Sequence, residues 1–234
     1  TRLDSLTVRG FYARTFRPDQ AELVITGDIT LAEARPEIAK RFGSWIQTRT
    51  APPRALTPPV VSRPSRREVF LVDKPGAAQS VIMIGAPGVA RSNPDFPAIE
   101  VMNTILGGSF SSRLNQNLRE TKGYTYGAGS QFIYRPVPGP FVARAAVRTD
   151  VTDSSLVEFF AELNRIRDSA VTSGELERAR NYIVLGLPGD FETTGQMGNQ
   201  IGDLLTFGLP TTYFDTYIRR VMAVTTSDVQ RVAR

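Results

Sequence analysis

The sequence contains neither histidine nor cysteine among its 234 residues. Without them the chain has no imidazole general base, no Ser-His-Asp or Cys-His triad, no His- or Cys-ligated zinc and no disulfide. Long hydrophobic runs are missing too. The longest, Val81 to Ala90, is interrupted by glycine and proline, whereas a membrane-spanning helix needs about 20 apolar residues. Chemistry performed by this chain alone would therefore depend on carboxylates, lysines, arginines or hydroxyls.

Lysine is scarce as well, because arginine supplies all but three of the 28 basic residues. A net charge of +5 with so much arginine could suit a nucleic-acid binder. The arginines are spread from Arg2 to Arg234, however, and no basic run of five or more residues occurs. A general compositional bias explains this pattern more simply, so nucleic-acid binding is kept only as a remote alternative.

Hydrophobic spacing and proline content divide the chain into three parts. Residues 1–46 are expected to form a helix, a buried strand at Ala21–Gly27 and a second helix from about Thr30 to Phe42. Residues 47–66 contain five prolines without a hydrophobic period, which indicates an extended linker. Residues 67–234 carry the remaining regular structure.

The third part predicts an α+β fold, with a largely antiparallel sheet and helices packed on one face. Strands joined by short turns come first, and a run of helices follows them. The expected strands are Glu68–Asp73, Gln79–Gly85, Tyr124–Tyr134 and Phe141–Thr149. The expected helices are 95–106, 111–121, 153–171, 174–186, 194–207 and 212–223, with another beginning at Ser227.

The most distinctive segment runs from Leu106 to Ser130. A pair of glycines, Gly107 and Gly108, precedes an amphipathic helix, and Gly123 turns the chain into the next strand. Arg119 near the end of that helix and Tyr126 on the strand could together supply donors for a carbonyl or an oxyanion. In the alternative interpretation, Arg119 pairs with Glu120 or Glu100 at the surface and the tyrosines pack.

The pattern S-R-L-x-x-x-L-R-E-x-x-G-x-x-Y at residues 112–126 resembles the C-terminal half-domain of the pitrilysin/insulinase-type zinc peptidases, which include mitochondrial processing peptidase. The similarity extends over nearly the whole chain. It includes residues 73–80, 106–108, 174–180, 208–210 and 224–229, and residues 16–28 are similar to the end of the preceding half-domain in that family.

This resemblance implies a metallopeptidase half-domain like those of the processing peptidases, without its own metal. In the family, an H-x-x-E-H helix in the other half holds zinc, and the second half closes over the peptide substrate. The substrate-holding Arg/Tyr pair of the family maps onto Arg119 and Tyr126, with Tyr124 a less favoured substitute for Tyr126. Gly107, Gly108 and Gly123 would form the supporting loop, and no catalytic or metal-binding residue is expected in this chain alone.

The resemblance also implies partners: a zinc-binding half-domain, either upstream in the same polypeptide or in a homologous subunit, and a peptide substrate. The half-domain at residues 67–234 would end before its last strand. We therefore expect Ala21–Gly27 to fill that place in the sheet, within the chain or in a strand-swapped dimer. A purely structural or partner-binding subunit is the alternative function. The compartment stays open between cytoplasm and periplasm, with bacterial relatives of the family favouring the periplasm.

Overall fold

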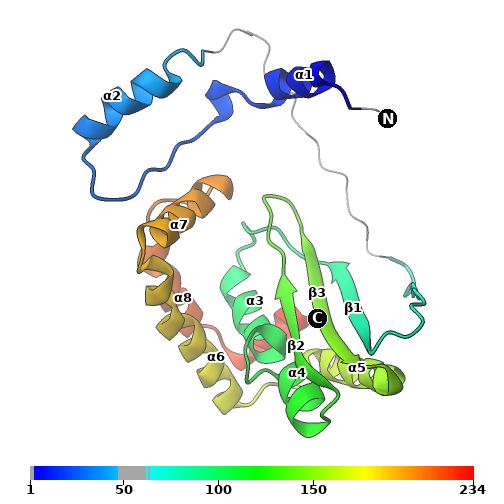
Figure 1. Ribbon diagram of the computed structural model, residues 1–234. Helices are drawn as coiled ribbons and strands as arrows, with labels where there is room; N and C mark the ends of the chain where they lie inside the picture. The colour runs from blue at the N-terminus through cyan, green and yellow to red at the C-terminus, as the bar shows by residue number, and fades with distance from the viewer. Residues whose placement is uncertain (1–2, 47–61, 63) are drawn as a thin grey trace.

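The computed structural model describes residues 3–46, 62 and 64–234, and two helices lie in its N-terminal part (Figure 1). Helix α1 spans Ser5–Thr15 and α2 spans Leu31–Phe42. A short 3-10 turn at Pro18–Gln20 follows α1. Helix α2 begins where the sequence predicts, because Thr30 and Glu33 form a reciprocal capping box. Most of the predicted linker lies outside the described residues.

The segment Ala21–Gly27, expected to be a buried strand, has no regular structure and pairs with no strand of the sheet. Leu23 and Ile25 expose 57% and 47% of their surface. A hydrogen bond of 2.7 Å from the Thr26 hydroxyl to the Thr194 carbonyl links this segment to the first residue of the helix at Thr194–Thr206. The prediction that this segment completes the sheet within the chain is wrong, because β-rich composition produces a strand only where a neighbouring strand is available.

Three strands form one antiparallel sheet in the order β1-β3-β2. They are β1 (Gln79–Pro87), β2 (Thr125–Phe132) and β3 (Pro140–Arg148), close to the predicted bounds. Another predicted strand, Glu68–Asp73, has no regular structure in the described residues, and the side chains of Val69–Val72 are 85–91% exposed. No described strand lies beside that segment, so its apolar run has nothing to pair with.

The helices that follow β1 in the chain are gathered on one side of the sheet (Figure 1). Helix α3 (Phe96–Asn103) continues into the π-helical turn η2 (Thr104–Gly108), and α4 (Arg113–Asn115) continues into the π-helical turn η3 (Gln116–Thr121). The 3-10 turn η4 (Thr149–Val151) then leads into the remaining elements, which are α5 (Thr152–Asp168), α6 (Ser173–Gly186), η5 (Leu187–Phe191), α7 (Thr194–Thr206), α8 (Tyr213–Met222) and α9 (Thr226–Ala233).

The core lies between the sheet and these helices. On β3, Ala143, Ala145 and Val147 alternate with more exposed residues, as a strand with one covered face requires. Leu114 and Leu118 of the distinctive segment are fully buried in the same hydrophobic core. The predicted α+β class with helices on one sheet face is confirmed. Within the described ranges, no helix has the length and apolar character needed to cross a membrane.

Candidate functional site

The helix formed by α4 and η3 carries the first site residue, Arg119, on its outward side. Leu114 and Leu118 are fully buried, which fixes the rotation of this helix and leaves Arg119 half-buried at the surface. The helix ends at Thr121, and two residues later Gly123 has a φ of +64°, a conformation that glycine adopts without steric cost. Gly123 thus lies at the turn between this helix and β2.

The guanidinium of Arg119 is held between a carboxylate and an aromatic ring. Its Nε lies 3.3 Å from Glu120 Oε1, and its Cζ lies 4.6 Å from the centre of the Phe110 ring. Of the two acidic partners considered from sequence, Glu120 is therefore the one used. Glu100 instead accepts a hydrogen bond of 2.7 Å from the Tyr134 hydroxyl, and burial raises its pKa.

Tyr126 lies in a β-bulge on β2 and is 88% exposed. Thr125 pairs with Val147 and Ala128 pairs with Ala145, so Tyr126 and Gly127 together lie opposite Ala146. The Thr125 hydroxyl fixes the bulge, donating to the Ala146 carbonyl at 2.6 Å and accepting from the Gly127 amide at 3.1 Å. Bulges commonly redirect a side chain at a functional site, and this one keeps the Tyr126 phenol in solvent. Tyr124, the less favoured substitute, packs partly buried against the core.

Asn115 connects the three segments that carry Phe110, Arg119 and Tyr126. Its side chain is 4% exposed, donates to the Phe110 carbonyl at 2.7 Å and accepts from the Ala128 amide at 3.3 Å. One amide therefore holds the loop that carries Phe110, the helix that carries Arg119 and the strand that carries Tyr126. Asn115 also satisfies a backbone donor on the outer edge of β2, which protects that edge.

Gly107 and Gly108 allow η2 to lie directly against β2. A Cβ atom at Gly107 would overlap the backbone nitrogen and hydroxyl of Ser130, and one at Gly108 would lie 2.9 Å from Asn103 Nδ2. Asn103 in turn donates to the Ser130 carbonyl at 3.1 Å and accepts from its hydroxyl at 2.8 Å. The glycine pair therefore supports the loop through close backbone approach.

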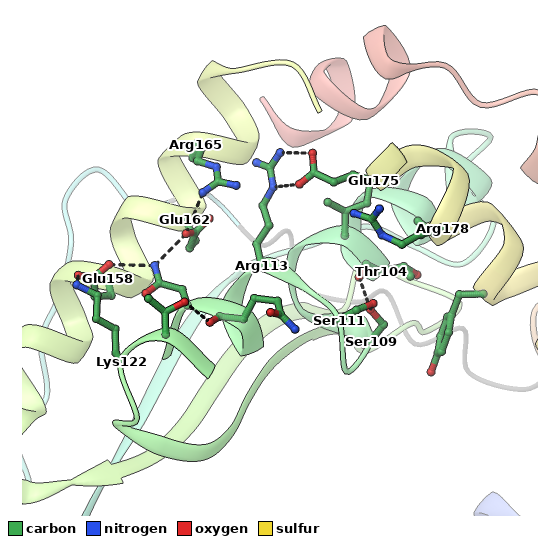
Figure 2. Close-up of a pocket in the computed structure, with 16 residues that line it drawn as sticks. Thr104, Ser109, Ser111, Arg113, Lys122, Glu158, Glu162, Arg165, Glu175 and Arg178 are labelled. Atoms are coloured by element: carbon green, nitrogen blue, oxygen red, sulfur yellow. Dashed lines mark hydrogen bonds and ion pairs between the residues drawn. The ribbon is translucent and has the colours of Figure 1, made fainter. Parts of the chain in front are cut away.

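A polar cavity of about 430 Å³ lies on the other side of the same helix, against α5 and α6 (Figure 2). Buried Arg113 makes a two-pronged ion pair with Glu175, at 2.7 Å and 3.1 Å. Lys122 pairs with Glu158 at 2.8 Å. The hydrogen bonds from Arg113 lower the pKa of Glu175 to about 2. These pairs fasten the Arg119-bearing helix to two neighbouring helices.

The residues of this chain do not fit a zinc site. The sequence has no His or Cys, and in the described residues no group of three or more acidic side chains gathers to hold a metal ion. What the site offers is a set of hydrogen-bond donors, the Arg119 guanidinium and the Tyr126 phenol. Donors of this kind can hold a peptide carbonyl or stabilise an oxyanion.

Sequence reasoning proposed Arg119, Tyr126 and the glycines as site residues and did not include Phe110, Asn115 or Thr125, which the structure places beside them. Phe110 follows the glycine pair directly, and a large aromatic residue predicted to lie in a surface loop was an available signal. Asn115 and Thr125 gave no such signal. Their roles depend on partners 13 and 21 residues away in the chain, Ala128 and Ala146.

A helix-backed antiparallel sheet with an outward-facing Arg119 and an exposed Tyr126 is the arrangement that the resemblance predicts for the non-catalytic half of a metallopeptidase. Residues 3–183 match the family described as the Peptidase M16 inactive domain. The match covers most of the chain, so the chain belongs to this family, and the resemblance noted from sequence is confirmed.

Curated relatives agree with this assignment. The chain is 28% identical over 233 residues to an uncharacterized zinc protease of Streptomyces coelicolor, covering 97% of this chain and 50% of that protein. An uncharacterized zinc protease of Bacillus subtilis is 25% identical over 232 residues, covering 97% and 54%. The chain thus spans about half the length of these curated relatives.

The fold is shared with two solved structures. A protease from Helicobacter pylori superposes with a TM-score of 0.86 at 18% identity, covering 99% of this chain and 56% of that one. A peptidase M16 inactive domain from Pseudomonas fluorescens superposes with a TM-score of 0.78 at 21% identity, covering 98% and 54%. Similarity at this level of identity supports the fold alone.

Proposed function

We propose that this chain is the substrate-clamping, non-catalytic half of a zinc metalloendopeptidase. The observation that carries the proposal is the presentation of Tyr126. An 88% exposed tyrosine is held on a bulge by Thr125, beside a helix whose buried side is fastened by ion pairs. A residue that served only packing would not need an exposed phenol on such rigid support.

In the proposed clamp, the Arg119 guanidinium donates to a backbone carbonyl of the bound peptide, and Phe110 keeps the guanidinium plane in place. The Tyr126 phenol donates to the oxygen of the scissile carbonyl and stabilises the negative charge that develops there. Tyr126 needs no change of protonation for this role, because its O–H acts as a donor throughout. The attacking water would be activated in the partner half, since the relatives are named zinc proteases.

The N-terminal segment, residues 3–46, supports the presence of such a partner half. Helix α1 has no buried residue, and Leu6, Phe11 and Tyr12 are 79%, 55% and 54% exposed. Apolar side chains exposed together usually mark a contact surface. We propose that this segment packs on the zinc-binding half, in the same polypeptide or in a homologous subunit.

The experiment is Tyr126→Phe in the complete protease, which contains this chain and its zinc-binding half. Loss of one oxyanion donor should lower kcat by about a hundredfold, with the thermal unfolding temperature unchanged because the side chain is exposed. Tyr182→Phe, an exposed tyrosine on α6, is the matched control and should leave kcat unchanged. A drop for Tyr124→Phe in place of Tyr126→Phe would move the donor role to Tyr124.

A partner-binding or scaffold subunit is the second candidate, and the Arg119 surroundings favour it. The Arg119 guanidinium already contacts the Glu120 carboxylate and the Phe110 ring at the surface. An arginine with a purely structural role would make contacts of this kind. If Tyr126→Phe and Arg119→Ala both retain wild-type turnover in the complete protease, the scaffold role holds and the clamp is wrong. The isolated chain should bind no stoichiometric zinc and cleave no peptide in either case.

A further inference from the structure

One face of the three-stranded sheet is left open by the helices. The residues of this open face follow from the strand register, because alternate side chains of a strand point to opposite faces of the sheet. Val81 and Met83 of this face are 74% and 67% exposed. The face comprises Val81, Met83 and Gly85 on β1, Val142, Arg144, Ala146 and Arg148 on β3, and Tyr126, Gly127, Gly129 and Gln131 on β2.

The open face is apolar or small-residue over most of its area, with two charged strand residues. Arg148 lies at the end of β3 and makes a two-pronged ion pair with Asp150, both contacts 3.1 Å long. Arg144 lies in the middle of the central strand and is exposed. Among the described residues, no carboxylate forms an ion pair with Arg144.

The neighbours of Arg144 leave its guanidinium available for a ligand. Its cross-strand partners are Met83 on one side and Gly129 on the other. Gly129 has no side chain, and a Cβ atom there would lie 2.9 Å from the Gly107 carbonyl oxygen, so η2 borders this position. Met83 offers a flexible apolar contact to the aliphatic part of the arginine side chain. A planar cation with five donors that forms no ion pair within the described part of the chain is suited to a carboxylate ligand.

Arg144 is also placed correctly relative to the clamp. Tyr126 lies opposite Ala146, and Ala146 is two residues from Arg144 on β3. Two strand positions correspond to about 7 Å, the distance between alternate residues of an extended peptide. A peptide lying across the open face with one carbonyl at Tyr126 would therefore bring a residue close to its cleavage site within reach of Arg144.

We propose that Arg144 binds a carboxylate of the peptide substrate and gives the protease a preference for acidic peptides. The proposal rests on the clamp function above and adds the substrate class. The carboxylate can come from an Asp or Glu side chain or from the peptide C-terminus, because both offer the same pair of acceptor oxygens to a guanidinium.

The test measures kcat/KM of the complete protease on quenched fluorescent peptides with amidated C-termini. The peptides differ by one residue, Asp, Asn or Lys, placed in turn at the three positions on each side of the cleaved bond. A second set compares free and amidated C-termini. We expect the wild type to prefer an acidic peptide, or a free C-terminus, by about fivefold over its neutral counterpart, the scale of one partly solvated ion pair. The preference should weaken as salt is raised.

Arg144→Gln should abolish this preference, and Arg144→Glu should reverse it toward the Lys peptide. Arg148→Gln, on the same strand and face but already paired with Asp150, is the matched control and should leave the preference unchanged. An equal preference in wild type and Arg144→Glu would overturn the proposal. So would an equal loss for all peptides, which would place the partner of Arg144 in the zinc-binding half.

The inference and the clamp can fail separately in these assays. Tyr126→Phe should lower turnover on every peptide while keeping the charge preference. If Tyr126→Phe has no effect but Arg144→Glu reverses the preference, Arg144 recognises substrate and the clamp assignment is wrong. If Tyr126→Phe lowers turnover and Arg144→Glu leaves the ratio of kcat/KM between the Asp, Asn and Lys peptides unchanged, the clamp assignment holds and Arg144 does not recognise the charge of the substrate.

Discussion

Arg113 and Arg119 belong to the same short helix yet have opposite surroundings. Arg113 faces inward, is 8% exposed and is gripped by both oxygens of Glu175. Arg119 faces outward on Phe110, with a single contact to Glu120 at 3.3 Å. The inward side of this helix, which carries Arg113, stabilises the fold. The outward side, which carries Arg119, leaves guanidinium donors available for a ligand. Substitutions on the inward side should therefore change stability, and substitutions on the outward side should change turnover.

The largest effect is expected for Glu175→Gln on the inward side. Removing one charge of a buried ion pair leaves Arg113 without its counter-charge, which should lower the free energy of unfolding by about 3 kcal/mol. Glutamine can keep the capping box that Glu175 forms with Thr172, so the change isolates the ion pair. Urea unfolding of the 234-residue chain measures it.

Asp168→Asn is the control for that comparison. The pair between Arg167 and Asp168 has a similar 2.8 Å contact, but about half of each side chain is exposed. Its loss should cost at most about 1 kcal/mol. Equal losses for Glu175→Gln and Asp168→Asn would show that the inward pair is not special, and the contrast between the two sides of the motif would fail.

Gly107→Ala tests the backbone support of the outward side. The added methyl group would overlap the Ser130 backbone and force η2 away from β2, at a cost of about 2 kcal/mol. Gly186→Ala is the matched control, because no atom lies within 4 Å of a Cβ there and alanine favours the end of α6. Thermal unfolding should fall for the first variant and stay level or rise for the second. A tolerated Gly107→Ala would contradict the close packing described here.

Sequence predicted this contrast only in part. The leucine spacing of the helix fixed which side is buried, and the glycines marked the turns, because both signals are local. The bulge at Tyr126 depends on how β2 pairs with β3, and the role of Asn115 depends on a strand amide 13 residues away. No local pattern contains that information.

The two strands predicted wrongly teach the same lesson. Ala21–Gly27 and Glu68–Asp73 have strand composition, yet both are irregular and largely exposed. Composition reports how well a residue suits a half-buried pleated surface, and it does not report whether a pairing strand exists. The strand predicted at Gln79–Gly85 does form, as β1, because β3 lies beside it along its whole length.

Arg119→Lys sharpens the contrast on the outward side. Lysine keeps the charge but loses the planar fork that lies on the Phe110 ring, so the peptide carbonyl would be held less exactly. We expect kcat/KM of the complete protease to fall about tenfold, equivalent to about 1.4 kcal/mol, with unchanged unfolding. Arg165→Lys, an exposed arginine on α5 that pairs with Glu162, should leave kcat/KM unchanged. A stability loss for Arg119→Lys without a loss of turnover would assign Arg119 to the structural side.

The smallest effect concerns acid, and its sign follows from the lowered pKa of Glu175. Its pKa falls from 4.5 to about 2 in the folded chain because Arg113 donates to the charged carboxylate. A group with a depressed folded pKa stabilises the fold above its unfolded value, and that contribution is lost as pH falls from about 4.5 toward 2. Between pH 6 and pH 3.5 the wild type should lose about 1 kcal/mol through this group. Glu175→Gln lacks the titrating carboxyl, so the difference in free energy of unfolding between wild type and Glu175→Gln should decrease by that amount. The other carboxyl groups titrate in both proteins and cancel in this difference. A gap that stays constant down to pH 3.5 would mean that Arg113 does not hold Glu175 ionised, and the inward side would lose its electrostatic basis.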